Sequence, residues 1–281
     1  MITTENSKKP PKNLTSSNNS PNTLSESPSQ SSLHMNIKKL AITKDFRIYP
    51  LDSLQRSYSF TEGSIDREEF LKHNHQGIIA TTKDHPMLIC DADFSDNYRR
   101  LKRGPACILP KDIGYIIAET AITKESVVLD AGAGMGASVC LLAGLCKKVY
   151  TCDVNEKHLE LTKENAKALN LTNIEFSHCS VTELELPELV DLVLLDVPNP
   201  LETLPEIKHK LRQGGNLVFY TPHISQAQEI INKLEEDEDI KIITTIEILQ
   251  RRWEIDQKRL RPKHNMLGHT AFLTFARVFK R

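Results

Sequence analysis

The segment from residue 127 to residue 137 joins an apolar run to three closely spaced glycines. It reads Val-Val-Leu-Asp-Ala-Gly-Ala-Gly-Met-Gly-Ala, which predicts a buried strand, a tight turn and the start of a helix. Glycines let the backbone turn sharply and approach a ligand closely, and the helix start supplies free N–H groups. The candidate ligand-binding residues of this turn are Asp130, Gly132, Ala133, Gly134 and Gly136.

A single carboxylate ends the next predicted strand. Asp153 lies 21 residues beyond Gly132, where it can accept hydrogen bonds from both hydroxyls of a ribose. Val154 follows it and belongs to the same predicted site. A strand, a glycine turn, a helix and an acid in this order predict a site for a nucleoside cofactor.

The glycines alone leave the cofactor open. Gly132, Gly134 and Ala137 also satisfy the dinucleotide fingerprint, in which the third position can be alanine. Asp130 ends the first strand, where it could meet the amino-acid moiety of S-adenosylmethionine. A second acid, Asp196, ends a later strand in a motif that has no part in nicotinamide binding. These two acids favour S-adenosylmethionine.

Asp196 follows four apolar residues and precedes the turn Val-Pro-Asn-Pro. It is expected at the carboxyl edge of the sheet, where open α/β folds bind their ligands, so it would also border the cofactor. The prolines stiffen the turn and fix the direction of the carboxylate. Such a carboxylate can accept a hydrogen bond from a purine amino group and stabilise the positive charge that methylation of a ring nitrogen creates. Asp196 is therefore the predicted catalytic residue; the alternative is that it caps the following helix.

From residue 104 onward, strand and helix patterns alternate, which predicts a doubly wound α/β domain. Two long strand-like runs close the chain and are expected to pair antiparallel. The expected strands are 126–130, 148–152, 173–177, 190–195, 216–221, 241–249 and 270–279, and the expected helices are 112–121, 137–145, 155–170, 201–212 and 223–235.

The first hundred residues differ from the rest of the chain. Residues 1–36 are rich in Ser, Asn, Thr, Pro and Lys, which predicts a disordered tail. Residues 37–103 show short alternating runs between polar turns, which predict a small β-rich module. The predicted division is thus a tail (1–36), a β-rich module (37–103) and an α/β domain (104–281).

Composition excludes several classes of protein. The 281 residues carry 36 Lys+Arg against 37 Asp+Glu, which excludes a bulk-basic nucleic-acid coat. No apolar run is long enough to span a bilayer, so no membrane partner is expected. The six cysteines never fall at CxxC spacing, so we expect no metal site of that kind and a reducing, cytoplasmic compartment.

One segment is locally basic. Residues 250–268 hold six Lys or Arg residues against two acids, an excess of four positive charges. A basic loop at the carboxyl edge could hold phosphates while an aromatic or arginine plane stacks on a base; the alternative is a solvated surface or a subunit interface. The predicted RNA-binding residues are Arg251, Arg252, Arg259, Arg261 and the nearby His269.

Several separated motifs together resemble the tRNA adenine-N1 methyltransferases, which make 1-methyladenosine in the T-loop, chiefly at position 58. They are Leu109-Pro110-Lys111-Asp112, Leu195-Asp196-Val197-Pro198-Asn199-Pro200, Arg259-Leu260-Arg261-Pro262 and His269-Thr270-Ala271-Phe272. The resemblance covers roughly residues 46–281 and rests on the order and spacing of these blocks.

The resemblance implies a class I methyltransferase with a Rossmann-like sheet of seven strands, S-adenosylmethionine as cofactor, tRNA as substrate and a homotetrameric assembly. It also implies that Gly132, Gly134 and Gly136 cradle the cofactor, that Asp153 holds its ribose and that Asp196 faces the adenine. The chain departs from the family where the third strand ends in His178-Cys179-Ser180. Many relatives place an adenine-binding acid there, and Ser180 is the expected substitute.

Three other functions stay open at this point. A class I methyltransferase could act on another RNA, an exocyclic amine or a protein side chain, because an Asp-x-Pro-x-Pro turn also occurs in enzymes of that kind. A non-catalytic RNA-binding subunit would have lost its glycines and the strand-end acid, and this chain retains Gly132, Gly134, Gly136 and Asp196. A nicotinamide dehydrogenase lacks support beyond the glycine fingerprint.

Overall fold

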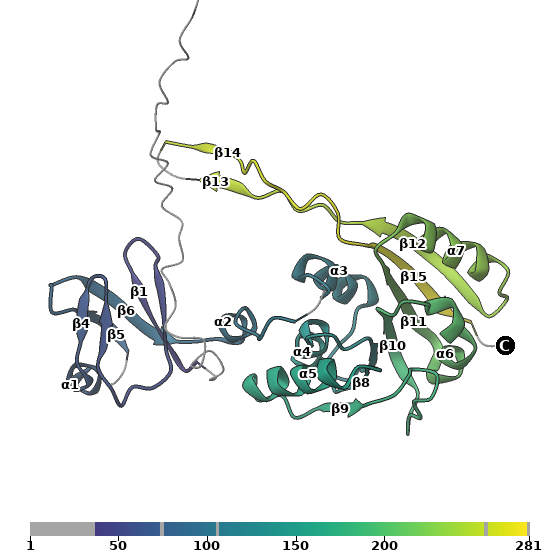
Figure 1. Cartoon of the computed structure of the whole chain (residues 1–281), viewed down its shortest axis with the longest axis horizontal. Coiled ribbons are helices and arrows are strands. Elements are labelled where there is room, and N and C mark those ends of the chain that lie inside the picture. The colour runs from purple at the N-terminus through teal and green to yellow at the C-terminus, as the bar shows by residue number, and fades with distance from the viewer. Residues whose placement is uncertain (1–36, 74–75, 105–106, 256–257, 280–281) are drawn as a thin grey trace, which may run out of the picture. The chain divides into compact units, whose positions relative to one another are not determined.

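The computed structural model describes residues 37–73, 76–104, 107–255 and 258–279 (Figure 1). The predicted tail, residues 1–36, lies outside these residues. None of the helices described is both long enough and apolar enough to cross a bilayer.

A seven-stranded sheet dominates the C-terminal two thirds of the chain, in the order β12-β15-β11-β10-β7-β8-β9 (Figure 1). The pairings from β11 through β10, β7 and β8 to β9 are parallel, whereas β15 runs antiparallel to both β11 and β12. The predicted doubly wound class and antiparallel edge are therefore confirmed. The strands are β7 (Val127–Ala131), β8 (Lys148–Cys152), β9 (Ile174–Ser177), β10 (Val190–Leu195), β11 (Leu211–Thr221), β12 (Ile240–Glu247) and β15 (Phe272–Val278).

Helices cover both faces of this sheet because neighbouring strand residues point to opposite sides. Val128 packs in a buried cluster with residues of α3 and α4, and Leu129 in a second cluster with residues of α6 and α7. The helical elements are α3 (Pro110–Thr120), α4 (Ala137–Ala143), α5 (Glu156–Ala168), the 3₁₀ turn η2 (Pro200–Thr203), α6 (Leu204–Lys210) and α7 (Ile224–Glu235).

The region before this domain is β-rich, as predicted, although it also contains two short helices that the sequence patterns did not reveal. A four-stranded antiparallel sheet has the order β2-β1-β6-β5, and β3 and β4 form a separate hairpin. Phe70 of α1 is fully buried with Leu51, Ile79 and Met87 in the core of this region. The elements are β1 (Lys39–Thr43), β2 (Ile48–Leu51), β3 (Tyr58–Phe60), β4 (Gly63–Ile65), α1 (Arg67–Lys72), β5 (Gly77–Ala80), β6 (Pro86–Asp91) and α2 (Phe94–Tyr98).

Two expectations from the sequence were wrong in detail. The segment 250–268, expected as a loop, contains a hairpin of β13 (Trp253–Ile255) and β14 (Leu260–Pro262). The helix expected over 201–212 ends at Lys210, because Leu211 already pairs with Val190 in the sheet. Both the hairpin and the end of the helix are set by pairing with a neighbouring strand, which a short stretch of sequence does not reveal.

A buried ion pair fastens the start of α3 to the strands on either side of the hairpin. The three donor positions of the Lys111 ammonium reach Asp112 Oδ1 at 2.6 Å, Thr270 Oγ1 at 2.7 Å and the Ile248 carbonyl at 2.8 Å. The Thr270 hydroxyl in turn donates to Asp112 Oδ2 at 3.0 Å. The Asp112 side chain is fully buried and that of Lys111 is 9% exposed. Lys111 and Asp112 thus connect α3 to the end of β12 and the start of β15.

Removing one member of this pair leaves an uncompensated buried charge. We expect Lys111→Met to lower the free energy of unfolding by about 3–5 kcal/mol, measured by urea denaturation. Lys111→Met combined with Asp112→Leu should recover much of that loss, because both charges are then gone. Lys124→Met, at an exposed lysine, is the control. If Lys111→Met has the same free energy of unfolding as this control, the ion pair does not stabilise the connection of α3 to β12 and β15.

Candidate cofactor and active site

The glycine turn and the strand-end acid meet where β7 lies beside β10. The Asp196 amide donates to the Ala131 carbonyl at 2.9 Å. Gly132 has a φ of +97°, and a Cβ at this position would lie 2.1 Å from the Asp196 carbonyl oxygen. Only glycine fits this backbone approach. Because β7 connects to β8 on one side while β10 lies on its other side, this is the switch point at which open α/β folds bind ligands.

The rest of the glycine turn is held by β8 and α5. The Gly132 and Ala133 amides donate to the Cys152 carbonyl at 3.0 and 3.3 Å. Gly136 has a φ of +80°, and a Cβ there would lie 2.7 Å from Thr162 Cγ2. The turn is therefore fixed before any ligand binds.

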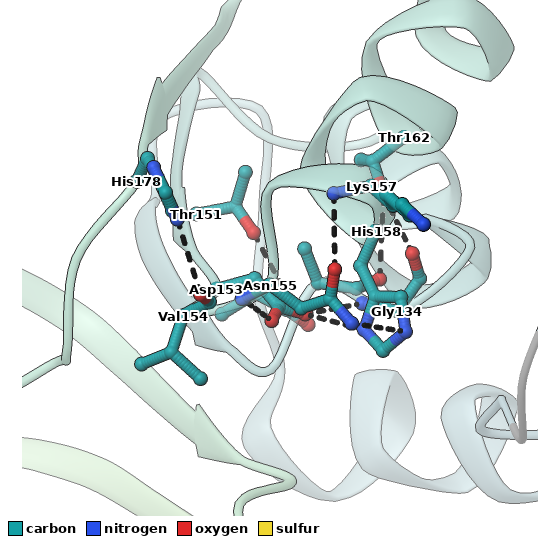
Figure 2. Close-up of polar contacts among 11 residues, drawn as sticks. Gly134, Thr151, Asp153, Val154, Asn155, Lys157, His158, Thr162 and His178 are labelled. Atoms are coloured by element: carbon teal, nitrogen blue, oxygen red, sulfur yellow. Dashed lines mark hydrogen bonds and ion pairs between the residues drawn. The ribbon is translucent and has the colours of Figure 1, made fainter.

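Asp153, as predicted, ends β8 beside this turn, with 9% of its surface exposed. Its Oδ2 accepts the Gly134 amide at 3.0 Å, and its Oδ1 accepts the Asn155 amide at 2.8 Å (Figure 2). His158 Nδ1 lies 3.3 Å from Oδ2. A carboxylate offers about four lone pairs, so Oδ1 keeps one for a ribose hydroxyl and a second hydroxyl would share Oδ2. Val154, 73% exposed, lies next to it.

Three polar residues of α5 support the site and were missed by the sequence analysis. His158 contacts Asp153, the Thr162 hydroxyl donates to the Gly134 carbonyl at 3.2 Å, and Asn165 Nδ2 donates to the Met135 carbonyl at 2.8 Å. Positions 158, 162 and 165 lie on one face of a helix. The sequence signal that could have revealed them is the row of polar residues at positions 158, 162 and 165 along this amphipathic helix.

The predicted acids are clustered at this edge. Burial is the main reason why the pKa of Asp130 rises to about 7, and the neighbouring acids Asp196 and Asp153 add to it. Burial also raises the pKa of Asp196 to about 6, with Asp153 as the second cause. Buried carboxylates near one another favour a cationic ligand. S-adenosylmethionine, with a sulfonium and an ammonium group, matches this charge.

Ser180, the predicted adenine contact, lies after β9 and is engaged in its own turn. Its Oγ is 2.9 Å from Thr182 Oγ1, and its amide donates to Glu183 at 3.2 Å. His178 Nε2 lies 3.1 Å from the Val154 carbonyl oxygen (Figure 2). His178 therefore ties the residue beside Asp153 to the end of β9.

Tyr220, near the end of β11, is a second functional candidate that the sequence analysis missed. Burial raises the pKa of Tyr220, and the negative charges of Asp112 and Asp196 raise it further. Its hydroxyl also hydrogen-bonds to Thr270. The charges of the catalytic candidate and of the buried ion pair thus both act on Tyr220. A tyrosine inside an apolar strand gave no separate sequence signal.

Four of the predicted RNA-binding residues belong to the hairpin or directly precede it. Arg261 pairs with Glu254 across the hairpin at 2.8 Å, and Arg259 lies 3.7 Å from the same carboxylate. Arg251 and Arg252 are exposed before β13.

His269 has a structural position. Its Nδ1 is 2.5 Å from Glu247 Oε1 and its Nε2 is 2.7 Å from the Pro222 carbonyl oxygen. The Glu247 contact is the main reason why the pKa of His269 is raised, since both acceptors favour a doubly protonated ring. It fastens the start of β15 to β12 and to the segment after β11.

No group of three or more His, Cys, Asp or Glu side chains within the described ranges is arranged to hold a metal ion.

A parallel sheet with an antiparallel edge, a fixed glycine turn and clustered acids at the switch point define a class I S-adenosylmethionine-dependent methyltransferase. The residues fit that cofactor, because Asp153 retains a lone pair for the ribose, Val154 is exposed beside it and the acids match its positive charge.

The chain belongs to the family described as tRNA methyltransferase complex GCD14 subunit, which matches residues 101–261, more than half of its length. The sequence is 28% identical over 271 residues to the tRNA (adenine(57)-N(1)/adenine(58)-N(1))-methyltransferase TrmI of Methanocaldococcus jannaschii, covering 85% of this chain and 94% of that protein. It is 26% identical over 224 residues to the tRNA (adenine(58)-N(1))-methyltransferase TrmI of Thermus thermophilus, covering 78% and 88%. The resemblance seen in the sequence is confirmed.

Two solved structures share the fold. A SAM-dependent O-methyltransferase from Thermotoga maritima superposes with a TM-score of 0.74 at 26% identity, covering 88% of this chain and 94% of that one. The tRNA (m1A58) methyltransferase TrmI of Aquifex aeolicus gives a TM-score of 0.71 at 23% identity, covering 88% and 98%. The predicted fold class and cofactor are therefore confirmed.

Proposed function

We propose that this enzyme transfers the methyl group of S-adenosylmethionine to N1 of adenosine 58 in the T-loop of tRNA. The observation that carries the proposal is Asp196 at the switch point, held against the glycine turn by its own backbone. The Thermus relative is named for adenine 58, and the Methanocaldococcus relative for adenines 57 and 58. Adenosine 57 is accordingly the second candidate acceptor.

The proposed cofactor contacts come from the segments that follow β7, β8 and β9. Asp153 accepts a ribose hydroxyl, while Val154 and Ser180 border the adenine. The turn residues Gly132, Ala133, Gly134 and Gly136 surround the cofactor, with Asp130 facing its amino-acid moiety. Bound there, the cofactor supplies an electrophilic methyl group on a sulfonium.

Asp196 provides position and charge rather than proton removal. Adenine N1 has a free lone pair, so it attacks the methyl group without a base, and positive charge then moves onto the purine. The Asp196 carboxylate accepts a hydrogen bond from the N6 amino group, which orients the base and stabilises that charge. Target N1 is hidden by pairing in folded tRNA, so the nucleotide has to be extruded into the pocket.

Asp196→Asn is expected to lower kcat on the order of 10²-fold or more, since the charge opposite the purine is lost, with cofactor binding largely intact. Wild-type kcat/KM should fall as the pH drops through about 6, because the raised pKa of Asp196 leaves about half of these carboxyl groups protonated at that pH in the free enzyme. The residual activity of Asp196→Asn should not show this decrease at low pH.

The assay uses labelled S-adenosylmethionine, unmodified tRNA transcripts and nucleoside mass spectrometry. Asp84→Asn, the same change on a surface turn, is the control. A methylated product other than 1-methyladenosine would overturn the proposed acceptor, and a 2′-O-methylated nucleoside would favour the chemistry named for the Thermotoga structure. Parallel losses of cofactor binding and turnover in Asp196→Asn would make the residue structural.

The hairpin offers two chemically different faces, because paired residues of β13 and β14 alternate. Trp253 pairs with Pro262 and Ile255 with Leu260, whereas Glu254 pairs with Arg261. We name the first set, Trp253, Ile255, Leu260 and Pro262, the apolar face. Glu254 and Arg261, with Arg252 and Lys263 joined by a backbone hydrogen bond of 2.9 Å, form the charged face.

We propose that the charged face, together with Arg251, Arg259 and His269, borders the bound tRNA. Arg251→Ala with Arg252→Ala should weaken tRNA binding and reduce the slope of log affinity against log salt by about one to two. Lys241→Ala with Arg277→Ala, two charges at the opposite end of β12 and β15, is the matched control. Filter binding at several salt concentrations measures both. An unchanged slope in the first variant would exclude phosphate contacts by these arginines.

We propose further that the apolar face packs against a second copy of this chain in a homotetramer. Ile255 and Leu260 are 76% and 74% exposed, and an isolated two-stranded hairpin is marginally stable in water. Ile255→Glu with Leu260→Lys should therefore dissociate the assembly in sedimentation-velocity runs. Ile224→Glu, at an apolar residue 61% exposed on α7, should leave it unchanged. A wild-type monomer at micromolar concentration would contradict the proposal.

The domain organisation belongs to the same proposal. We assign residues 37–103 to an N-terminal β-rich module and residues 104–281 to the methyltransferase domain. We also propose a cytoplasmic location, which a tRNA substrate supports.

A further inference from the structure

A chain of hydrogen bonds starts at the first turn of α5 and ends on Asp153 (Figure 2). Asn155 caps the helix, because its Oδ1 accepts the Lys157 amide at 3.0 Å. The Asn155 Nδ2 then faces His158 Nε2 at 3.2 Å, and His158 Nδ1 faces Asp153 Oδ2 at 3.3 Å.

This order of contacts fixes the proton positions. Asn155 Oδ1 is an acceptor in the cap, so its other side-chain atom is the amide nitrogen, which only donates. His158 Nε2 must accept from it, and the ring proton therefore lies on Nδ1. From there it is donated to the Asp153 carboxylate. The helix cap thus selects the His158 tautomer that hydrogen-bonds to Asp153.

We propose that His158 is a positioning residue for cofactor binding, which it serves by orienting the Asp153 carboxylate toward the ribose. The inference rests on the proposed role of Asp153. With Oδ2 held by His158 and the Gly134 amide, the open lone pair on Oδ1 is left to face the ligand. His158 itself does not contact the reacting atoms.

The contacts argue against a role limited to helix stability. The capping bond of α5 runs from the Lys157 amide to Asn155, so His158 does not itself satisfy a free amide of the helix. The His158 side chain is 31% exposed and that of Asp153 is 8% exposed, so a partly exposed imidazole contacts a nearly buried carboxylate.

The variant His158→Phe removes the donor and keeps a ring of similar shape. We expect it to raise the Kd of S-adenosylmethionine, measured by calorimetry, about tenfold, as for loss of one hydrogen bond to a charged group. The KM for the cofactor should rise in step, while kcat at saturating cofactor and the KM for tRNA stay unchanged. His158→Asn restores an N–H near the Nδ1 position and should recover most of the affinity. His209→Phe, at an exposed histidine of α6, is the matched control.

A double-mutant cycle tests whether His158 acts through Asp153. If it does, His158→Phe should cost little affinity in an Asp153→Asn background, since the carboxylate it orients is gone. Additive losses would overturn the inference, as would an unchanged Kd in His158→Phe. Equal losses in His158→Phe and His158→Asn would show a packing role, which also overturns it. Circular dichroism and melting temperature establish that each variant is folded.

The two proposals fail in different ways. If Asp153→Asn leaves cofactor affinity unchanged, the proposed role of Asp153 fails and the inference falls with it. If Asp153→Asn weakens binding but His158→Phe does not, only the inference about His158 fails. Because calorimetry needs no tRNA, a wrong acceptor nucleotide affects neither result.

Discussion

The contact on which the rest of the site depends is that between the backbones of Gly132 and Asp196. A single added carbon at Gly132 would lie 2.1 Å from the Asp196 carbonyl oxygen, so the two segments approach as closely as backbones can. This approach places a cofactor turn from one strand and an acid from its neighbour at one point. Neither segment could serve the reaction alone, since the methyl donor and the acceptor base have to meet within bonding reach.

The parts of this arrangement that follow from local chemistry could be predicted from the sequence. Apolar strands, the glycine turn, Asp153 and Asp196 each carry a pattern of their own, and parallel strands bring their carboxyl ends to the same edge. The hairpin could not be predicted, because its strands are three residues each and gain their identity only from pairing. The His158, Thr162 and Asn165 contacts depend on which face of α5 turns toward the glycine loop.

Charge explains why such a site is more favourable with its ligand than without it. Burial raises the pKa of Asp130 to about 7 and that of Asp196 to about 6, so ionising both near Asp153 is costly in the free protein. A cationic cofactor lowers that cost by supplying the opposite charge within the same edge. Transfer of the methyl group moves the positive charge from the cofactor to the purine, and the proposed role of Asp196 is to stabilise that charge there.

The polar residues that surround the site fall into two groups with different consequences for function. His158, Thr162 and Asn165 contact Asp153 and the glycine turn and belong to one helix, so their effects should be coupled through α5. Lys111, Asp112 and Thr270 form the second group, and the pKa of Tyr220 is raised by the negative charges of both Asp112 and Asp196. The ion pair also sets the base of the hairpin whose charged face is proposed to border tRNA. Because Ile248 and Thr270 flank the hairpin, loss of this one buried lysine should disturb both the base of the hairpin and the buried Asp112 carboxylate.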